Sequence, residues 1–183
     1  MEGRDAGATV RVNILAVTAV VLLATGALGA ALGTRTPAVD GGGACPAADA
    51  RIVVDLTKHV LTLCDGKLPA GSFTVWLGRG GAGKTREGDG KTPVGTYRLG
   101  PPRTSNRFGT FIPIEYPSEE QKKLGYTGGD VGIHGPPRWA RWLGRLVSAF
   151  DLSRGCVGLA RDREIEQVAS WVRTRSVHTI ELR

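Results

Sequence analysis

The hydrophobic positions of this chain fall into one long run near the N-terminus and many short runs after residue 50. The long run covers residues 12–33, a stretch of 22 residues without a charged side chain. This length is enough to span a bilayer as a helix, whereas the small residues of its second half are typical of the stretch before a signal-peptidase site. We therefore expect residues 1–33 to form either an uncleaved signal anchor or a cleaved signal peptide. Both alternatives place the rest of the chain outside the cytoplasm, in the periplasm or cell envelope.

Residues 34–50 separate the long run from the short ones. Glycine, proline and alanine dominate this segment, which can bury little apolar surface, so we expect a linker. After it, stretches rich in Val, Ile, Thr and aromatic residues alternate with Gly, Pro and Asp, the pattern of strands and turns. The expected strands cover residues 51–56, 60–64, 71–77, 92–99, 108–115 and 131–134, a run that begins at residue 157, and residues 177–182.

Three segments show helical patterns instead. Residues 118–124 begin with a serine that is followed three residues later by Gln121, as in a capping box. Asp162 is typical of an N-cap, and apolar residues follow it at helical spacing. Residues 136–150 carry three arginines and two tryptophans, which favours a helix with an exposed basic face. The pattern as a whole predicts a mainly β domain with two or three short helices. The apolar positions after Asp162 are Ile165, Val168, Ala169 and Val172.

Charge narrows the kinds of partner. The chain has a formal charge of +7 and a pI near 9.8, which suits a nucleic acid, a membrane surface or an acidic cell-wall polymer. Aromatic residues make up only 6% of the chain, and no basic stretch alternates with them. A single-stranded nucleic acid needs such stacking residues, so we expect no nucleic-acid partner.

Residues 78–85 (GRGGAGKT) match the pattern of a phosphate-binding loop after a strand. That motif also requires a helix to begin directly after its Lys-Thr pair, because the helix N-terminus holds the phosphate. Here residues 86–93 follow, and Gly88, Gly90 and Pro93 oppose a helix. We therefore expect no nucleotide site at this loop.

A histidine and a cysteine stand in the glycine-rich stretch of residues 131–159. His134 ends a short apolar run, and Cys156 follows Gly155 and precedes another apolar run. A thiol needs a base to become a nucleophile, and an imidazole within hydrogen-bond reach can supply it. A glycine before the cysteine allows a sharp turn, so that backbone N–H groups could point at an oxyanion. From spacing alone, however, a Cys and a His 22 residues apart are more often structural than catalytic.

Four motifs resemble those of one enzyme family. His134-Gly135, followed by Ser153-Arg154-Gly155-Cys156-Val157, is similar to the H-G and [S/T]-x-G-C-[I/V] signature of the L,D-transpeptidases, the YkuD-type catalytic domain. Residues 88–97 (GDGKTPVGTY) resemble the family segment G-D-G-x-T-P-x-G-x-[YF]. Residues 109–117 and 128–135 resemble the murein L,D-transpeptidase branch. The resemblance implies a β-sandwich-like catalytic domain over residues 51–183.

The resemblance also implies acyl transfer on peptidoglycan stem peptides. Cys156 would attack the carbonyl between the third residue, usually a diamino acid, and the terminal D-Ala, which forms a thioester. His134 would act as the general base, and backbone N–H groups around Gly155 and Cys156 would hold the oxyanion. The chemistry needs no cofactor and no metal, and three scattered histidines offer no zinc spacing. Carbapenem-type β-lactams are expected inhibitors because their strained carbonyl mimics the peptide carbonyl.

Two departures from the family leave the substrate contacts open. The widely quoted pattern is S-H-G-C-I-R, whereas this chain has Arg154 two residues before Cys156 and Gly158 two residues after it. The cation that binds the substrate carboxylate is therefore open, with Arg154, Arg138 and Arg145 as the candidates. The segment of residues 136–150 corresponds to an insertion that overhangs the site in the family, so a lid is a second interpretation of it. Candidate substrate contacts are Ser153, Arg154, Gly135, Arg138 and Arg145.

The acceptor of the thioester is also open. An amine on another stem would give a 3-3 cross-link, an amine on a protein would attach that protein, and water would make the enzyme a carboxypeptidase or a hydrolase that releases lipoprotein. A non-catalytic peptidoglycan-binding module would need only the fold and the charge, but the intact Cys156, His134 and Gly155 argue against it. A membrane is an expected partner only through residues 12–33, if they remain uncleaved.

The other two cysteines form a possible pair. With Cys156 assigned as the nucleophile, Cys45 and Cys64 remain in a chain that is expected to meet an oxidising environment. A hairpin of residues 51–56 and 60–64 would put Cys64 opposite about Arg51, within reach of Cys45. A disulfide and two free thiols are the alternatives.

Overall fold

The computed structural model describes residues 45–149, 151 and 153–183. The expected anchor or signal peptide and most of the expected linker lie outside these residues. Within the described part, no helix combines the length and the apolar character that a membrane crossing requires.

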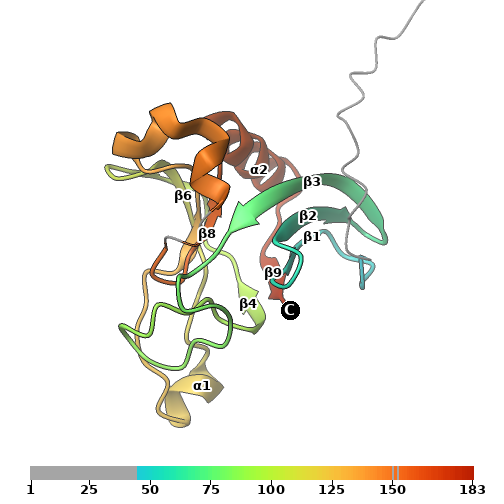
Figure 1. The fold of residues 1–183 in the computed structure, drawn as a ribbon. Helices are drawn as coiled ribbons and strands as arrows, with labels where there is room; N and C mark the ends of the chain where they lie inside the picture. Colours follow the sequence, from blue (N-terminus) through green and yellow to red (C-terminus); the bar gives the residue numbers. More distant parts are fainter. Residues whose placement is uncertain (1–44, 150, 152) are drawn as a thin grey trace, which may run out of the picture. The chain divides into compact units, whose positions relative to one another are not determined.

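One curled sheet forms the body of the described residues (Figure 1). Its nine strands lie in the order β4-β9-β1-β2-β3-β8-β7-β6-β5. Two α-helices and one 3-10 helix accompany it in the described part, so the expected mainly β domain with two or three short helices is confirmed. The strands are β1 Arg51–Asp55, β2 Val60–Asp65, β3 Leu68–Trp76, β4 Gly95–Arg98, β5 Arg103–Ser105, β6 Gly109–Pro113, β7 Gly132–His134, β8 Val157–Leu159 and β9 Thr179–Leu182, and the helices are α1 Glu119–Lys123, η1 Arg138–Ala149 and α2 Asp162–Thr174.

Strand β3 connects the two halves of the sheet. Its first part pairs with β2, whereas its last residues pair with β8, Val75 with Leu159 and Trp76 with Gly158. In Figure 1 it is a long curved strand that runs from β2 to β8. Since a single strand belongs to both halves, it fixes the position of β8, which follows the candidate nucleophile, against the rest of the domain.

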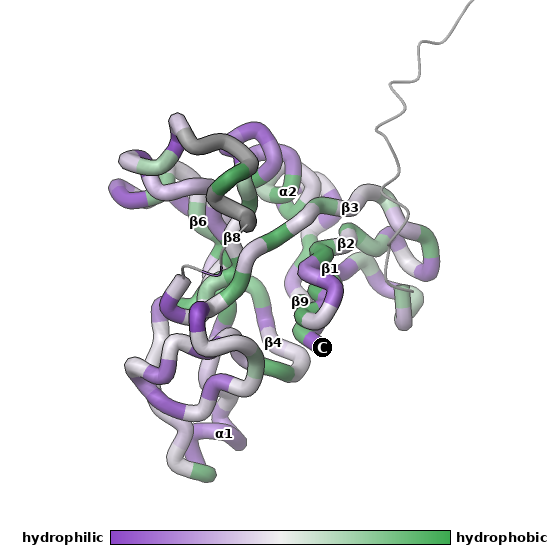
Figure 2. The backbone as a smooth tube through the Cα atoms, viewed as in Figure 1, coloured by the Kyte–Doolittle hydropathy of each residue, from purple (hydrophilic) through white to green (hydrophobic). Residues whose placement is uncertain are grey.

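A cluster of buried apolar side chains is shared by the strands and helix α2. In Figure 2 the hydrophobic colour follows the strands, while α1 is hydrophilic and buries no residue. Helix α2 buries Ile165, Val168, Ala169 and Val172, as their helical spacing predicts, and it packs on β6 and β8. Tertiary packing of this stripe stabilises α2 more than its intrinsic propensity does.

The two helix starts differ in how well the sequence predicts them. The capping box of α1 is confirmed, because the Ser118 hydroxyl accepts a hydrogen bond from the Gln121 N–H and the Gln121 side chain accepts one from the Ser118 N–H. The expected N-cap of α2 is wrong by one residue. Arg161, with extended backbone, is the N-cap, and Asp162 is the first helical residue. The carboxylate of Glu164 accepts a hydrogen bond from the Arg161 N–H at 3.2 Å, which favours this earlier start.

Strand β5 was not expected. Its three residues are polar, and they pair antiparallel with β6, Arg103 opposite Phe111 and Ser105 opposite Gly109. Such a short polar strand carries no hydrophobic alternation, so its sequence gives no sign of it. It matters for function because it places Arg103 and the turn after Ser105 beside β6.

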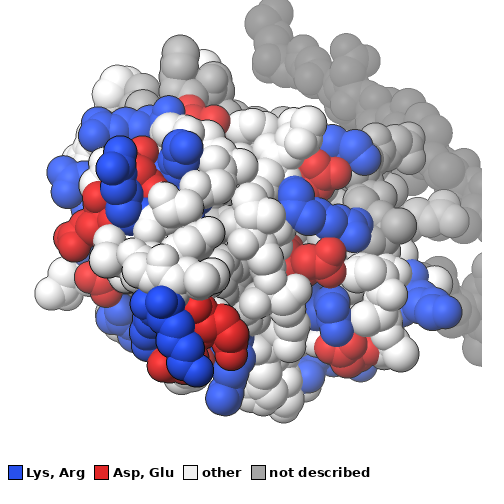
Figure 3. All heavy atoms as spheres, turned by 90° about the horizontal axis from the view of Figure 1, so that it is seen from below, with Lys and Arg blue, Asp and Glu red and all other residues white. Residues whose placement is uncertain are grey.

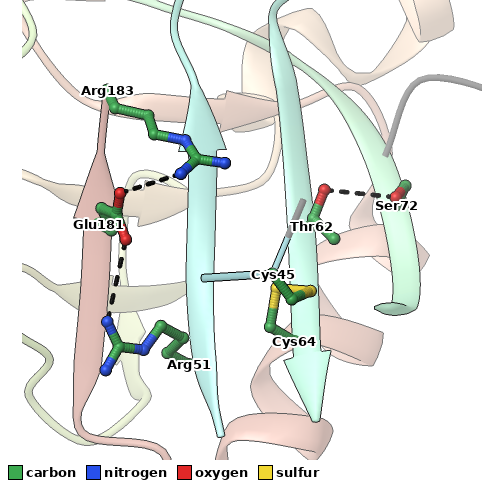
Figure 4. Close-up of a disulfide and its surroundings, with 7 residues drawn as sticks. All are labelled: Cys45, Arg51, Thr62, Cys64, Ser72, Glu181 and Arg183. Carbon is green, nitrogen blue, oxygen red and sulfur yellow. Dashed lines mark hydrogen bonds and ion pairs between the residues drawn. A yellow bond between two sulfur atoms is a disulfide. The ribbon is translucent and has the colours of Figure 1, made fainter. Parts of the chain in front are cut away.

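The disulfide between Cys45 and Cys64 is present (Figure 4). The Cα atoms of the two residues are 5.6 Å apart, and Arg51 pairs with Cys64 across the β1–β2 hairpin, as expected. The same close-up shows Glu181 on β9 between Arg51 and Arg183. The disulfide therefore ties the start of the described chain to the fully buried Cys64 on β2.

Charges of both signs lie together on the face drawn in Figure 3, with uncharged atoms across its middle. The described residues also form ion pairs, such as Arg141 with Asp162 at 2.9 Å and Arg175 with Asp65 at 2.8 Å. On this face the net charge of +7 does not form one wholly basic surface.

Candidate active site

Strands β7 and β8 bring the two candidate catalytic residues together. They pair in parallel, with Ile133 opposite Val157 and His134 opposite Gly158. Cys156 precedes Gly158 by two residues, and side chains two apart along a strand share a face. The imidazole and the thiol therefore lie on the same face of the sheet, and both line a cleft of about 1000 Å³.

His134 is held in an aromatic setting and is only 1% exposed. The ring of Phe108 stacks on it with centroids 3.6 Å apart, and Trp76 meets it edge-on at 5.3 Å. Its Nδ1 lies 2.7 Å from the Gly135 carbonyl oxygen, which can only accept a hydrogen bond. Nδ1 therefore carries the proton of the neutral ring, and Nε2 is left as the proton acceptor.

Burial lowers the pKa of His134 to about 4, the hydrogen bond to Gly135 opposes this shift, and the charge of Arg107 adds to it. The imidazole is consequently neutral near pH 7, which is the state that a general base requires.

Cys156 is the free cysteine of the described residues and is partly buried. Its thiol donates to the backbone carbonyl of Asp130, with Sγ and O 3.5 Å apart. Burial raises the pKa of the Cys156 thiol, while a hydrogen bond from the Gly132 backbone and the charge of Arg107 act in the opposite direction. The raised pKa favours the neutral thiol, so a thiolate at this position would need a base to accept its proton, and Nε2 of His134 is the candidate.

The turn before Cys156 requires a glycine. Gly155 has a φ of 128°, and a Cβ at this position would overlap the carbonyl oxygen of Lys91. The Ser153 hydroxyl bridges the turn, since it donates to the Cys156 carbonyl at 2.8 Å and accepts from the Gly155 N–H at 3.0 Å. The Gly155 N–H is thus engaged with Ser153 in this structure.

The loop of residues 78–85, which matches a phosphate-binding pattern, packs against the turn before Cys156. The Lys84 ammonium pairs with Asp89 at 2.9 Å and donates to the Arg86 carbonyl at 3.0 Å. Burial alone would raise the pKa of Asp89, but hydrogen bonds from the Lys91 N–H and from Lys84 hold it far below its usual range. Residues 86–94 form turns and isolated bridges. The lysine of this loop therefore neutralises a carboxylate of the same chain.

The family pattern has an arginine two residues after the cysteine, and the structure explains why this chain has Gly158 there. A Cβ at this position would overlap the ring of Trp76, so a longer side chain has no room. Trp76 is also the residue that meets His134 edge-on. The space beside the histidine is thus filled from β3 and not from the residue two positions after the cysteine.

The candidate substrate contacts divide into those in the cleft and those elsewhere. Ser153 and Arg154 line it. The α-carbon of Gly135 faces α2, because a Cβ there would lie 2.9 Å from Ile165. Arg138 is exposed and does not line the cleft, and the side chain of Arg145 lies outside what the structure describes.

Sequence reasoning missed several residues of the cleft. Most are cations or aromatic residues from β3, the β5–β6 hairpin and nearby loops. Some stand in the patterns described above, such as Lys84 in residues 78–85 and Phe111 in residues 109–117, but none of these patterns assigns the residue to the cleft. The pairing of Phe111 with His134 is the one clue that correct strand registers would have given. These residues are Trp76, Arg79, Lys84, Arg103, Arg107, Phe108, Phe111 and Asp130.

Comparison with known proteins agrees with the geometry. Residues 49–180 match the family described as the L,D-transpeptidase catalytic domain, YkuD. No curated protein sequence matches the chain.

Two solved structures share the fold with TM-scores above 0.5, and a third shows a weaker similarity. The helical cell shape determining protein Pgp2 from Campylobacter jejuni is 27% identical with a TM-score of 0.59, and the match covers 73% of this chain and 47% of that one. Bd1075 from Bdellovibrio bacteriovorus is 22% identical with a TM-score of 0.54, over 73% and 47% of the two chains. L,D-transpeptidase 3 from Mycobacterium tuberculosis, in complex with a faropenem-derived adduct, is 15% identical with a TM-score of 0.47, over 73% and 60%.

The present chain thus spans about half the length of Pgp2 and Bd1075. Its catalytic-domain match, in contrast, extends over most of the chain, from the residues before β1 into β9, and it includes both His134 and Cys156. The chain belongs to the L,D-transpeptidase (YkuD) catalytic domain family.

Proposed function

We propose that this protein is a cell-wall cysteine acyltransferase that acts on peptidoglycan tetrapeptide stems. One observation carries the proposal. A buried, neutral imidazole with its proton on Nδ1 shares a sheet face and a cleft with a free thiol. The family match supports a transpeptidase-type activity of this site.

The first half-reaction forms a thioester. Cys156 Sγ attacks the scissile carbonyl carbon while its proton passes to Nε2 of His134, and the carbonyl oxygen becomes an oxyanion. Backbone N–H groups of Cys156 and Gly155 stabilise this charge, each worth about 2.7–4 kcal/mol in comparable sites. The Gly155 N–H must exchange its bond with the Ser153 hydroxyl to do so. When the intermediate collapses, the C–N bond breaks and His134 gives the proton to the departing amine of D-Ala.

The second half-reaction releases the acyl group. An acceptor amine loses its proton to His134 and attacks the thioester carbonyl, and the thiol leaves with a proton returned by the imidazole. We propose an amine acceptor, on a second stem or on an envelope protein, and water is the alternative. The chain would act in the periplasm or cell envelope, where its substrate lies, and residues 12–33 would anchor it if they remain uncleaved.

The test uses purified protein with defined tetrapeptide muropeptides and mass analysis of the products. We expect loss of D-Ala and a cross-linked product, and we expect neither from Cys156→Ala. A carbapenem should leave a covalent adduct that maps to the peptide with Cys156. Undiminished turnover by Cys156→Ala would refute the proposal.

The histidine is tested against a matched control. His134→Ala should slow acylation by about 10²–10⁴-fold, the usual cost of losing a general base. His178→Ala, which changes an exposed histidine outside the cleft, should react like the wild type. Equal acylation rates for the two variants would remove His134 from the mechanism.

A further inference from the structure

The cleft contains an arginine that no carboxylate of the described residues pairs with. Arg107 lines the cleft next to Phe108, and none of the ion pairs formed in the described part of the chain involves its exposed guanidinium. Its Cζ atom lies 5.0 Å from the centroid of the Phe108 ring. An exposed cation stacked on an aromatic ring keeps its hydrogen-bond donors available for a ligand.

The backbone around Arg107 is fixed from two sides. The Ser105 hydroxyl accepts hydrogen bonds from the N–H groups of Arg107 and Phe108, at 3.3 and 3.4 Å. The carbonyl of Arg107 accepts one from the N–H of Arg138 at 3.1 Å. These hydrogen bonds fix the position from which the Arg107 side chain extends, which lowers the cost of ordering this turn when a ligand binds.

Arg107 is also placed beside the reactive pair. The ring on which it stacks is the one that stacks on His134 at 3.6 Å. Its positive charge favours the deprotonated form of both His134 and Cys156, although burial raises the pKa of Cys156 overall. Lys84 also influences Cys156, but Asp89 already neutralises that ammonium.

The substrate of the proposed reaction carries an anion close to the bond that breaks. The terminal residue of a tetrapeptide stem has a free carboxylate on the same carbon as the scissile amide nitrogen. A guanidinium can hold such a carboxylate with two parallel hydrogen bonds, which fixes its orientation as well as its position. A cation that binds this carboxylate would therefore lie near the histidine that protonates the departing amine.

We propose that the Arg107 guanidinium, held on Phe108 beside His134, binds the terminal carboxylate of the stem peptide and thereby selects stems with a free C-terminus. This inference rests on the proposed function. Because Gly158 has no room for a side chain beside Trp76, the cation comes from the turn between β5 and β6 and not from the segment after the nucleophile.

The experiment compares two substrates, a tetrapeptide stem with a free carboxylate and the same stem as its C-terminal amide. Release of the terminal residue is followed by mass analysis, and kcat/KM is measured for each substrate. The wild type should prefer the acid by about 10- to 100-fold, in keeping with a hydrogen bond to a charged group in a cleft. Arg107→Ala should lose most of this preference because turnover of the acid falls while that of the amide stays, and Arg107→Lys should keep part of it.

Arg103→Ala is the matched control. Arg103 lines the same cleft, and its Cζ atom lies 5.0 Å from the centroid of a different ring, that of Phe111. Its removal takes an equal charge from the cleft, and the acid-over-amide preference should stay near the wild-type value. A loss of preference equal to that of Arg107→Ala would assign the effect to general charge and overturn the inference.

The remaining outcomes separate this inference from the proposed function. If the wild type turns over neither substrate, the proposed function fails and the inference falls with it. If the wild type turns over acid and amide equally, or if Arg107→Ala slows both substrates alike and keeps the preference, the inference alone is wrong. If Arg107→Ala slows both substrates alike, Arg107 supports the fold of the site and does not bind the carboxylate.

Discussion

Acidification should destabilise the folded protein through His134. Burial holds the pKa of this imidazole at about 4 in the folded chain, against 6.5 in the unfolded one. Between these two values the unfolded chain binds a proton that the folded chain does not. The free energy of unfolding must therefore fall as the pH decreases from about 6.5 toward 4 and level off below that range.

The magnitude follows from the size of the shift. One pKa unit corresponds to about 1.4 kcal/mol, so the full effect of His134 is about 3 kcal/mol and roughly 2 kcal/mol is already lost at pH 5. This is a large share of the 5–15 kcal/mol that is typical of a domain. Asp89 does not disturb the measurement, because its hydrogen bonds hold its pKa far below its usual range and it stays ionised above pH 5.

Urea unfolding at a series of pH values from 8 to 5 provides the assay. We expect the free energy of unfolding of the wild type to decrease toward pH 5 by about 2 kcal/mol more than that of His134→Gln, which cannot titrate at this position. His178→Gln, which changes an exposed histidine, should keep the wild-type slope. The reasoning is refuted if His134→Gln and the wild type lose stability with the same slope.

Three further predictions concern the disulfide, the turn and the thiol. Replacing Cys45 and Cys64 together by alanine should lower the free energy of unfolding by about 3 kcal/mol, which is the entropic value for a loop with their sequence separation of 19. Urea unfolding measures this change, and an unchanged free energy of unfolding would contradict the prediction. Gly155→Ala should slow carbapenem acylation by about 10²-fold or more because the overlap with Lys91 displaces the oxyanion donors, whereas Gly129→Ala, with open space around it, should react like the wild type. Alkylation of Cys156 by iodoacetamide should still rise with pH above the range in which an ordinary thiol ionises, since its pKa is raised, and a plateau at neutral pH would contradict this.

The strands that carry most of the hydrophobic core could be predicted from sequence because each has a clear apolar pattern. The β1–β2 hairpin is an example, and its register even allowed the pairing of Cys45 with Cys64 to be anticipated as one of two alternatives. Strand β5 could not be predicted, since its residues from Arg103 to Ser105 are polar and gain their conformation only from pairing with β6. Propensity is a weak guide where a tertiary partner decides the structure.

The candidate site was predictable only in part, for a related reason. His134 and Cys156 belong to contiguous motifs, so their residues can be recognised without knowing the fold. Arg107 and Phe108 belong to no motif and reach the histidine through the pairing of β6 with β7, in which Phe111 lies opposite His134. A strand register is a long-range property, and a period-2 pattern fixes the face of a strand but not its partner.

The glycine-rich loop of residues 78–85 shows that one sequence pattern can have two different structural roles. In a phosphate-binding loop, glycines let the backbone approach a phosphate. Here Gly78 and Gly80 let it approach other backbone. A Cβ on Gly78 would overlap the Gly90 carbonyl oxygen and lie 3.0 Å from the Gly155 α-carbon, and a Cβ on Gly80 would overlap the Asp89 carbonyl oxygen. The lysine of the pattern likewise meets an anion, but that anion is the carboxylate of Asp89. The loop thus packs against the turn before Cys156, and the close approach of backbone to backbone accounts for Gly78 and Gly80.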